Sequence, residues 1–441
     1  MTPTIDETLR LRGQRTSGFD YIRITLAASI ILWHAIPLSY GPAVELTYWR
    51  SPFGWAYHFV LPMFFALSGF LVAGSLNRCP TLISFFGLRV LRIVPALSVE
   101  ITLSALLLGP ALTSYTVAAY FADPRFHSYF LNIVGEIHYV LPGLFDSNPL
   151  PSMVNGQLWT IPYELQCYLA IGGLAVTAAL RQRVILLVVV LASQALWVWQ
   201  AIKMGEDGSS GGASGPVLVV SFLAGILFHL YRDRIRLSRT AFLVVLAGSI
   251  ALSALPHGAY YLPLSATYLT IYLGLLNPRP IRLVSSGDYS YGLYLYGYPL
   301  QQAVAAIGPE THHWWINAGV SLPATLLIAI LSWRMVEKPA LGLRHRIPAV
   351  EAKLVALAIG AASQSGVAGS RAGTPVLLAT LTAAAGVGGI AGSLLLANGT
   401  VGLACTAILG SFAAALCVAR LGRAPGVATA PVMPKNLAAS E

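Results

Sequence analysis

The first long apolar stretch of the chain contains two ionisable residues, Arg23 and His34. Such residues are costly within an apolar helix and usually have a function there. Their separation is close to three helical turns, so they would share one helix face about 16 Å apart. A neutral histidine can take a proton from a hydroxyl group because its ordinary pKa is about 6.5. The pair therefore indicates proton-transfer chemistry; the structural alternatives are an interfacial anchor for Arg23 and an interhelical hydrogen bond for His34.

Two more arginines, Arg89 and Arg92, precede the apolar stretch 93–112. They are three residues apart and would lie on one face of a helix that extends over them. Guanidinium groups bind phosphate through paired hydrogen bonds, so the two could hold a phosphorylated ligand where the membrane meets the cytoplasm. Arginines at the end of a span also set topology, and both explanations stay open.

An acidic residue, Glu164, interrupts a later apolar run that begins near residue 159. A carboxylate in such a run needs a partner. It could pair with an arginine or orient His34, and the structural alternative is an ion pair without a role in chemistry.

The composition sets the environment in which these residues act. Of 441 residues, 56% are hydrophobic and 10% are charged, and the mean hydropathy is +0.69. Soluble domains carry about a quarter charged residues, so we predict an all-α, polytopic integral membrane bundle surrounded by the lipid bilayer. The net charge of +10 lies in short clusters between apolar runs, which does not favour nucleic acid. The four cysteines have no metal-ligand spacing, so we expect no metal, and the sequence does not indicate an oligomeric state.

About ten apolar runs are long enough, or nearly so, for transmembrane helices. They are 22–38, 56–76, 93–112, 158–179, 184–202, 216–231, 240–256, 260–276, 289–307 and 315–336. We therefore expect a cytoplasmic segment over 1–19, a membrane domain over 20–346 and an Ala/Gly-rich tail over 347–441. Two uncharged runs in the tail, 374–397 and 401–419, predict a possible extra hairpin of two helices.

The distribution of basic residues up to residue 346 supports this map, with the N-terminus in the cytoplasm. The segments predicted to be internal hold Arg10, Arg12, Arg15, Arg23, Arg78, Arg89, Arg92, Arg181, Arg183, Arg232, Arg234, Arg236, Arg239, Arg279, Arg282, Arg334, Lys338, Arg344 and Arg346. The segments predicted to be external hold Arg50, Arg125 and Lys203. A wrong number of spans would remove this asymmetry.

Several sequence blocks, taken in order, resemble the acyltransferase family 3 of membrane proteins. FDYIRITLAASIILWHA carries the family's pattern of Arg, ten residues and His at Arg23 and His34. FFALSGFLVAGS resembles the second helix, and FGLRVLRIVPAL resembles the Arg-x-x-Arg segment at Arg89 and Arg92. Any one block is weak, but the ordered set is fairly specific.

The later blocks extend the resemblance to residues 18–345. NGQLWTIPYELQCYL resembles a block with Trp159 and Glu164, and SYGLYLYGYPLQQ and SWRMVEKPAL resemble the closing blocks. Many members have a second histidine in the block that here reads YLYGYP, where Gly297 or its neighbours stand. A second catalytic histidine is therefore not expected in this chain.

The resemblance implies an enzyme that transfers an acyl group from cytoplasmic acyl-CoA to a sugar hydroxyl. We expect acetyl-CoA as the donor, a surface polysaccharide or glycolipid as the carbohydrate acceptor, and the bacterial inner membrane as the location. The expected catalytic residues are His34 and Glu164, and the expected substrate-binding residues are Arg23, Arg89, Arg92 and Trp159. The alternative class is a secondary transporter that uses intramembrane His, Arg and Glu, although no inverted repeat is visible.

Overall fold

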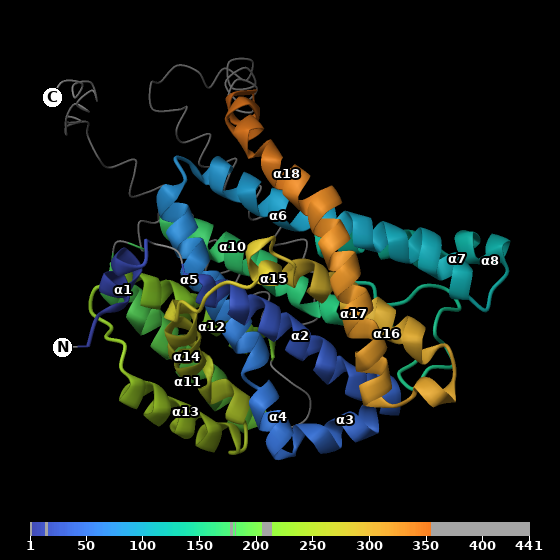
Figure 1. Ribbon diagram of the computed structural model, residues 1–441, viewed down its shortest axis with the longest axis horizontal. Helices are drawn as coiled ribbons and strands as arrows, with labels where there is room; N and C mark the ends of the chain where they lie inside the picture. Colours follow the sequence, from blue (N-terminus) through green and yellow to red (C-terminus); the bar gives the residue numbers. More distant parts are fainter. Residues whose placement is uncertain (1, 14–15, 177–179, 181, 205–213, 354–441) are drawn as a thin grey trace. The chain divides into compact units, whose positions relative to one another are not determined.

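The helices of the chain form one packed bundle in the part that the structure, a computed structural model, describes (Figure 1). That part comprises residues 2–13, 16–176, 180, 182–204 and 214–353. The longer helices are α2 (Ser17–Tyr40), α5 (Val60–Arg78), α6 (Leu82–Leu103), α10 (Ile161–Val176), α11 (Arg183–Met204), α12 (Gly215–Leu230), α13 (Arg239–Ser253), α14 (Pro263–Leu275), α16 (Ser290–Ala305) and α17 (Trp314–Ser332). The predicted hairpin in the tail lies outside the described residues.

Each of the ten predicted spans overlaps one of these helices. Five stretches of the described chain are long and apolar enough to cross a membrane: Ser17–Tyr40, Pro52–Arg78, Leu82–Leu112, Arg183–Lys203 and Trp314–Lys353. Helices α10, α12, α13, α14 and α16 have 13 to 16 residues, fewer than the roughly 20 that a perpendicular crossing needs. The helical class is therefore confirmed, and five stretches of the described chain meet the length and composition that a crossing requires.

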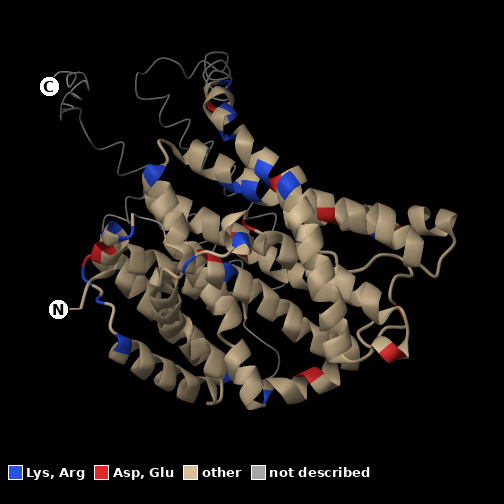
Figure 2. Cartoon of the chain, in the orientation of Figure 1, with Lys and Arg blue, Asp and Glu red and all other residues tan. Residues whose placement is uncertain are grey.

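Helix α11 shows most directly that this bundle faces lipid. Only 17% of its apolar window is buried inside the protein. Its exposed side chains include Val184, Val188, Leu191, Leu196 and Trp199. Charged residues stand only at the ends of α11, and α13 likewise has its single charge at Arg239 (Figure 2). A large apolar surface of this kind is stable against hydrocarbon rather than water.

Helix α2 carries the first pair of candidate residues on one uninterrupted element. It begins after Thr16 and ends at Gly41, whose φ of 81° a residue with a side chain rarely adopts. α2 packs against α5, α14, α16 and α17, so segments far apart in the sequence surround it. Arg23 and His34, both partly exposed, therefore lie on one continuous helix, which is the condition for the shared face that their spacing predicted.

Helices α5 and α12 pack with their backbones in close approach. A Cβ atom at Gly69 would lie 2.0 Å from the carbonyl oxygen of Phe222, and one at Gly225 would lie 2.2 Å from that of Ala66. Two glycines on facing helices thus remove the side chains that would separate the helices, as is common in membrane bundles. The contact brings the C-terminal ends of α5 and α12 together.

Helix α6 begins earlier than the predicted span 93–112. The hydroxyl of Thr81 accepts a hydrogen bond from the backbone N–H of Ser84 at 3.1 Å, which caps a helix that starts at Leu82. The helix continues through a π turn over Ser104–Leu108 into α7 (Gly109–Leu112). Arg89 and Arg92 consequently lie within a helix, where neighbouring helices can contact them.

Candidate active site

His34 lies on α2 with its ring edge-on to the ring of Tyr298 from α16. The ring centroids are 5.0 Å apart and the planes are inclined at 76°. His34 is partly exposed, and in the described part of the chain no hydrogen bond engages its ring nitrogens. Tyr298 is 4% exposed. The imidazole is thus packed against Tyr298, and its ring nitrogens are not engaged by another described residue.

The surroundings of Tyr298 hold its ring in place. Its hydroxyl donates to Sδ of Met153 at 3.0 Å, and a Cβ atom at Gly156 would lie 2.5 Å from its Cζ atom. A Cβ atom at Gly297 would lie 2.8 Å from Cγ1 of Ile31, so α16 and α2 are in tight contact beside the histidine. In the block YLYGYP, this chain therefore places Tyr298 against His34.

Residues that precede Gly156 are anchored by a buried polar network around Glu100. The carboxylate Oε1 of Glu100 accepts hydrogen bonds from the Ser104 hydroxyl at 2.6 Å and from Nδ2 of Asn155 at 2.9 Å. Glu100 is 1% exposed and Asn155 is fully buried. The Oε2 atom of Glu100 is buried without a hydrogen-bond partner among the described residues, so the network is only partly satisfied. Its bond to Asn155 still ties α6 to the segment that contacts Tyr298.

Asp288 joins two of the predicted arginines. Its Oδ2 atom lies 3.0 Å from Nη1 of Arg23 and 2.6 Å from Nη2 of Arg92, and its Oδ1 atom accepts from the Ser290 hydroxyl at 2.6 Å. Burial acts to raise the pKa of the Asp288 carboxyl, but the charges of Arg92 and Arg23 outweigh burial and hold that pKa well below its usual range. Asp288 was missed in the sequence; its one signal there is an acid directly before an apolar run.

Arg89 and Glu164 lie close to this cluster through Tyr168 of α10. Nη2 of Arg89 donates to the hydroxyl of Ser75 at 3.0 Å, and its guanidinium lies over the rings of Phe85 and Tyr168 at 5.6 and 5.7 Å. The Tyr168 hydroxyl donates to Glu164, on which the charges of Arg92 and Arg89 also act.

The hydrogen-bond partner of Glu164 in the described residues is Tyr168, and these residues contain no ion pair between Glu164 and an arginine. The described residues contain no hydrogen bond between Glu164 and His34. Trp159, in the turn Gly156–Thr160, is half-buried and meets the ring of Tyr163 at 5.9 Å.

The site therefore has two levels joined by α2. One level is His34 with Tyr298, and the other is the cluster of Arg23, Arg92 and Asp288. A free imidazole can accept a proton, and guanidinium groups can attract an anionic substrate. Within apolar helices, this combination suits a membrane-bound group-transfer enzyme.

Comparison with known proteins identifies the group that is transferred. The chain belongs to acyltransferase family 3, since the model of that family, an acyltransferase domain, matches residues 16–334. The protein is thus a membrane acyltransferase. It is 29% identical to nodulation protein 10 of Rhizobium leguminosarum bv. viciae over 370 residues, which cover 76% of this chain and 95% of the relative. It is 28% identical to an O-acetyl transferase of Shigella phage Sf6 over 336 residues, covering 74% and 96%. No solved structure matches the chain.

Proposed function

We propose that this acyltransferase moves an acetyl group from cytoplasmic acetyl-CoA to a hydroxyl of a surface polysaccharide or glycolipid sugar. The observation that carries the proposal is the imidazole of His34, which is partly exposed, oriented by Tyr298 and unbonded at both nitrogens in the described chain. The relative named as an O-acetyl transferase supports acetyl as the group. The family does not favour the secondary transporter.

His34 supplies general base catalysis in this proposal. The sugar oxygen attacks the thioester carbonyl carbon while a ring nitrogen of His34 accepts the hydroxyl proton. The carbon–sulfur bond then breaks, and the protonated ring returns the proton to the departing CoA sulfur. The products are an O-acetyl ester and free CoA, and His34 regains its neutral form. The edge-on contact with Tyr298 keeps the ring aimed through both steps.

Surface glycans provide the test of the acceptor. Mass spectrometry should detect an increment of one acetyl group on a glycan from cells that contain the protein, and no increment in cells that lack it. Purified protein should also release CoA from acetyl-CoA. Flux of a solute across proteoliposomes without acetyl-CoA turnover would instead support the transporter class.

The donor-binding role proposed for Arg89 and Arg92 can be separated from topology. Replacing both with Lys keeps the positive charge but removes the planar fork that grips phosphate. We expect acetyl-CoA affinity to fall by about 1–3 kcal/mol per lost charge-assisted contact, measured by calorimetry in detergent. Arg334→Lys is the matched control, because Arg334 is exposed beyond α17. Wild-type affinity in the double Lys variant would make both arginines structural.

We also propose ten crossings with a cytoplasmic N-terminus. Cys79, partly exposed after α5, is a native internal probe. Exposed Ser147 is a suitable position for an external probe. In a chain whose other cysteines are replaced by Ala, an impermeant thiol reagent should label a Ser147→Cys variant in intact cells and leave Cys79 unlabelled until the cells are opened. The reverse labelling pattern contradicts the proposed orientation.

A further inference from the structure

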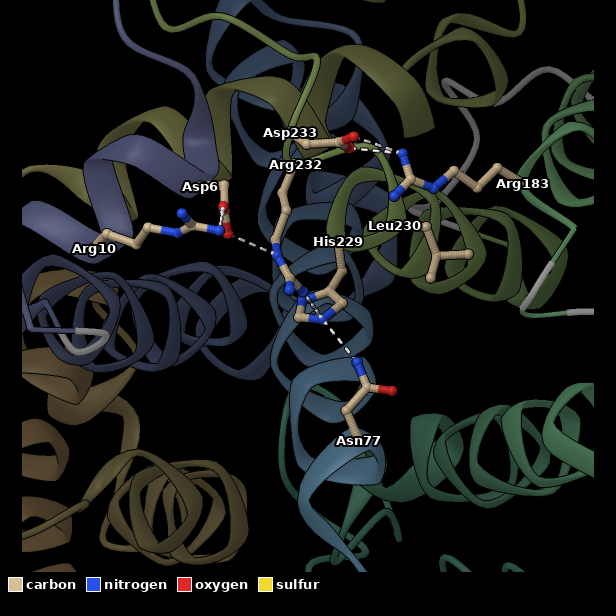
Figure 3. A pocket seen from close by; sticks show the side chains of 8 residues that line it. All are labelled: Asp6, Arg10, Asn77, Arg183, His229, Leu230, Arg232 and Asp233. Carbon is tan, nitrogen blue, oxygen red and sulfur yellow. Dashed lines mark hydrogen bonds and ion pairs between the residues drawn. The ribbon is translucent and has the colours of Figure 1, made fainter. Parts of the chain in front are cut away.

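A cavity of about 340 Å³ lies where the C-terminal ends of α5 and α12 meet α1 (Ile5–Leu11) and the start of α11 (Figure 3). Arg10, Arg183 and Arg232 line it from three separate segments of the chain. Leu230 is the one apolar side chain among those that line it. An apolar ligand would bury the polar groups of this cavity without giving them hydrogen-bond partners, which costs free energy. The polar groups therefore determine which ligand the cavity binds.

The acids of the cavity neutralise only part of its positive charge. Asp6 pairs with Nη2 of Arg10 at 2.8 Å and with Nε of Arg232 at 2.9 Å. Asp233 accepts two hydrogen bonds from Nη1 of Arg183, at 2.7 and 2.8 Å. Three guanidinium groups thus face two carboxylates, and each guanidinium has more N–H groups than its ion pairs use. The excess charge and the remaining donors favour an anion.

His229 adds an acceptor rather than a charge. Nη1 of Arg232 and Nδ2 of Asn77 approach its Nε2 atom at 2.6 and 3.4 Å. Since both partners are donors, Nε2 accepts and the ring is neutral in this arrangement. Arg78 lies near the same ring. Both side chains approach Gly74: the position of a Cβ atom there is 3.2 Å from Cε1 of His229 and 3.5 Å from Nη1 of Arg78. Arg78 therefore increases the positive field around the cavity.

The cavity lies at the end of α5 that also carries Ser75, the hydrogen-bond partner of Arg89. Asn77 in its wall is two residues after Ser75. On the other side, Ile5 of α1 belongs to one apolar cluster with Phe19 of α2, four residues before Arg23. An extended ligand bound in the cavity could thus continue toward α2 and Arg89 along the same end of the bundle.

We propose that this cavity binds the phosphorylated nucleotide end of the acyl-CoA donor. The inference rests on the proposed function and adds, to Arg89 and Arg92, a second cluster of arginines for the several phosphates of the donor. CoA carries its phosphates at one end and the thioester at the other. Guanidinium groups that converge from separate segments match the phosphate end. An anionic lipid headgroup shares this phosphate chemistry, so the test includes it as a separate arm.

Two substitutions that break the same ion pair distinguish ligand binding from structure. Arg183→Gln removes a phosphate donor, and Asp233→Asn removes a competing carboxylate. Arg183 and Asp233 are 41% and 47% exposed, so losing the pair itself has little effect on folding. We expect Arg183→Gln to weaken acetyl-CoA binding about tenfold, near the low end for a charge-assisted contact because of that exposure. Asp233→Asn should bind acetyl-CoA more tightly than wild type.

Calorimetry on detergent-purified full-length protein provides the measurement, with S-acetyl-pantetheine as the donor analogue that lacks the nucleotide. Affinity for this analogue should be the same in both variants and in wild type. Arg234→Gln is the control, because Arg234 is exposed on the same loop but does not line the cavity; it should bind acetyl-CoA as wild type does.

Three results would overturn the proposal. They are unchanged acetyl-CoA affinity in Arg183→Gln, equal weakening for acetyl-CoA and S-acetyl-pantetheine, and a loss confined to binding of phosphatidylglycerol vesicles. The last result would assign the cavity to a lipid headgroup. If wild-type protein binds no acetyl-CoA, the proposed function itself fails; if it binds acetyl-CoA and Arg183→Gln has no effect, only this inference fails.

Discussion

Replacing His34 with Ala should reduce acetyl transfer on the order of 10²–10⁴-fold, the usual loss on removal of a general base. The effect should fall on turnover, since no donor-binding role is proposed for the imidazole. The variant should still insert into the membrane and accumulate. The His34 side chain is partly exposed, and its ring forms no hydrogen bond with another described residue. Transfer is measured with labelled acetyl-CoA on purified protein, together with protein quantity and thermal unfolding.

Three companion variants isolate the role of His34. His34→Gln keeps a polar side chain that cannot accept the proton as a base near neutral pH, so it should be as inactive as the Ala variant. His127→Ala removes an exposed histidine on α9 (Pro124–Tyr129) and should retain wild-type transfer. Tyr298→Phe keeps the ring against His34 and should lose little activity. A stable His34→Ala protein with wild-type transfer would remove His34 from the mechanism.

Replacing Asp288 with Asn should produce the largest loss of stability among the substitutions discussed. The change leaves Arg23 and Arg92 without the carboxylate that lies 3.0 and 2.6 Å from them. Breaking a fully buried pair costs about 3–5 kcal/mol, and partial exposure of these side chains lowers the expected cost to roughly 1–3 kcal/mol. Acetyl transfer should fall as well, because both arginines lose their fixed positions. The melting temperature and the transfer rate are the measurements.

A double-mutant cycle tests whether this loss belongs to the ion pair. Arg92→Gln with Asp288→Asn should be less destabilised than the sum of the two single variants, since the double variant leaves no buried charge from this pair unmatched. Asp123→Asn is the control, because Asp123 pairs with exposed Arg125 far from this cluster in the sequence. It should melt close to wild type. Additive effects in the cycle would show that Asp288 and Arg92 do not interact energetically.

The candidate site was only partly predictable, and Glu164 and Asp288 show why. Glu164 was identified from its charge in an apolar run, but that signal left its partner open between His34 and an arginine. The structure gives it Tyr168, which belongs to neither alternative, as its hydrogen-bond partner. Asp288 stands just outside a span, where an acid is not unusual. Its importance follows from Arg23, which lies 265 residues away in the sequence.

The sequence by itself determined the helical membrane class, the approximate positions of the long helices and the shared face of Arg23 and His34. Each of these depends on local properties, namely the length of apolar runs and the period of the α-helix. The tertiary structure decided which side chains meet: Tyr298 with His34, Asp288 with two arginines, and three further arginines around one cavity. Those contacts join residues from different helices. They depend on how the helices pack. Glycines such as Gly69 and Gly225 influence that packing because they let two helix backbones approach closely. The periodicity of a single segment does not encode which helices meet.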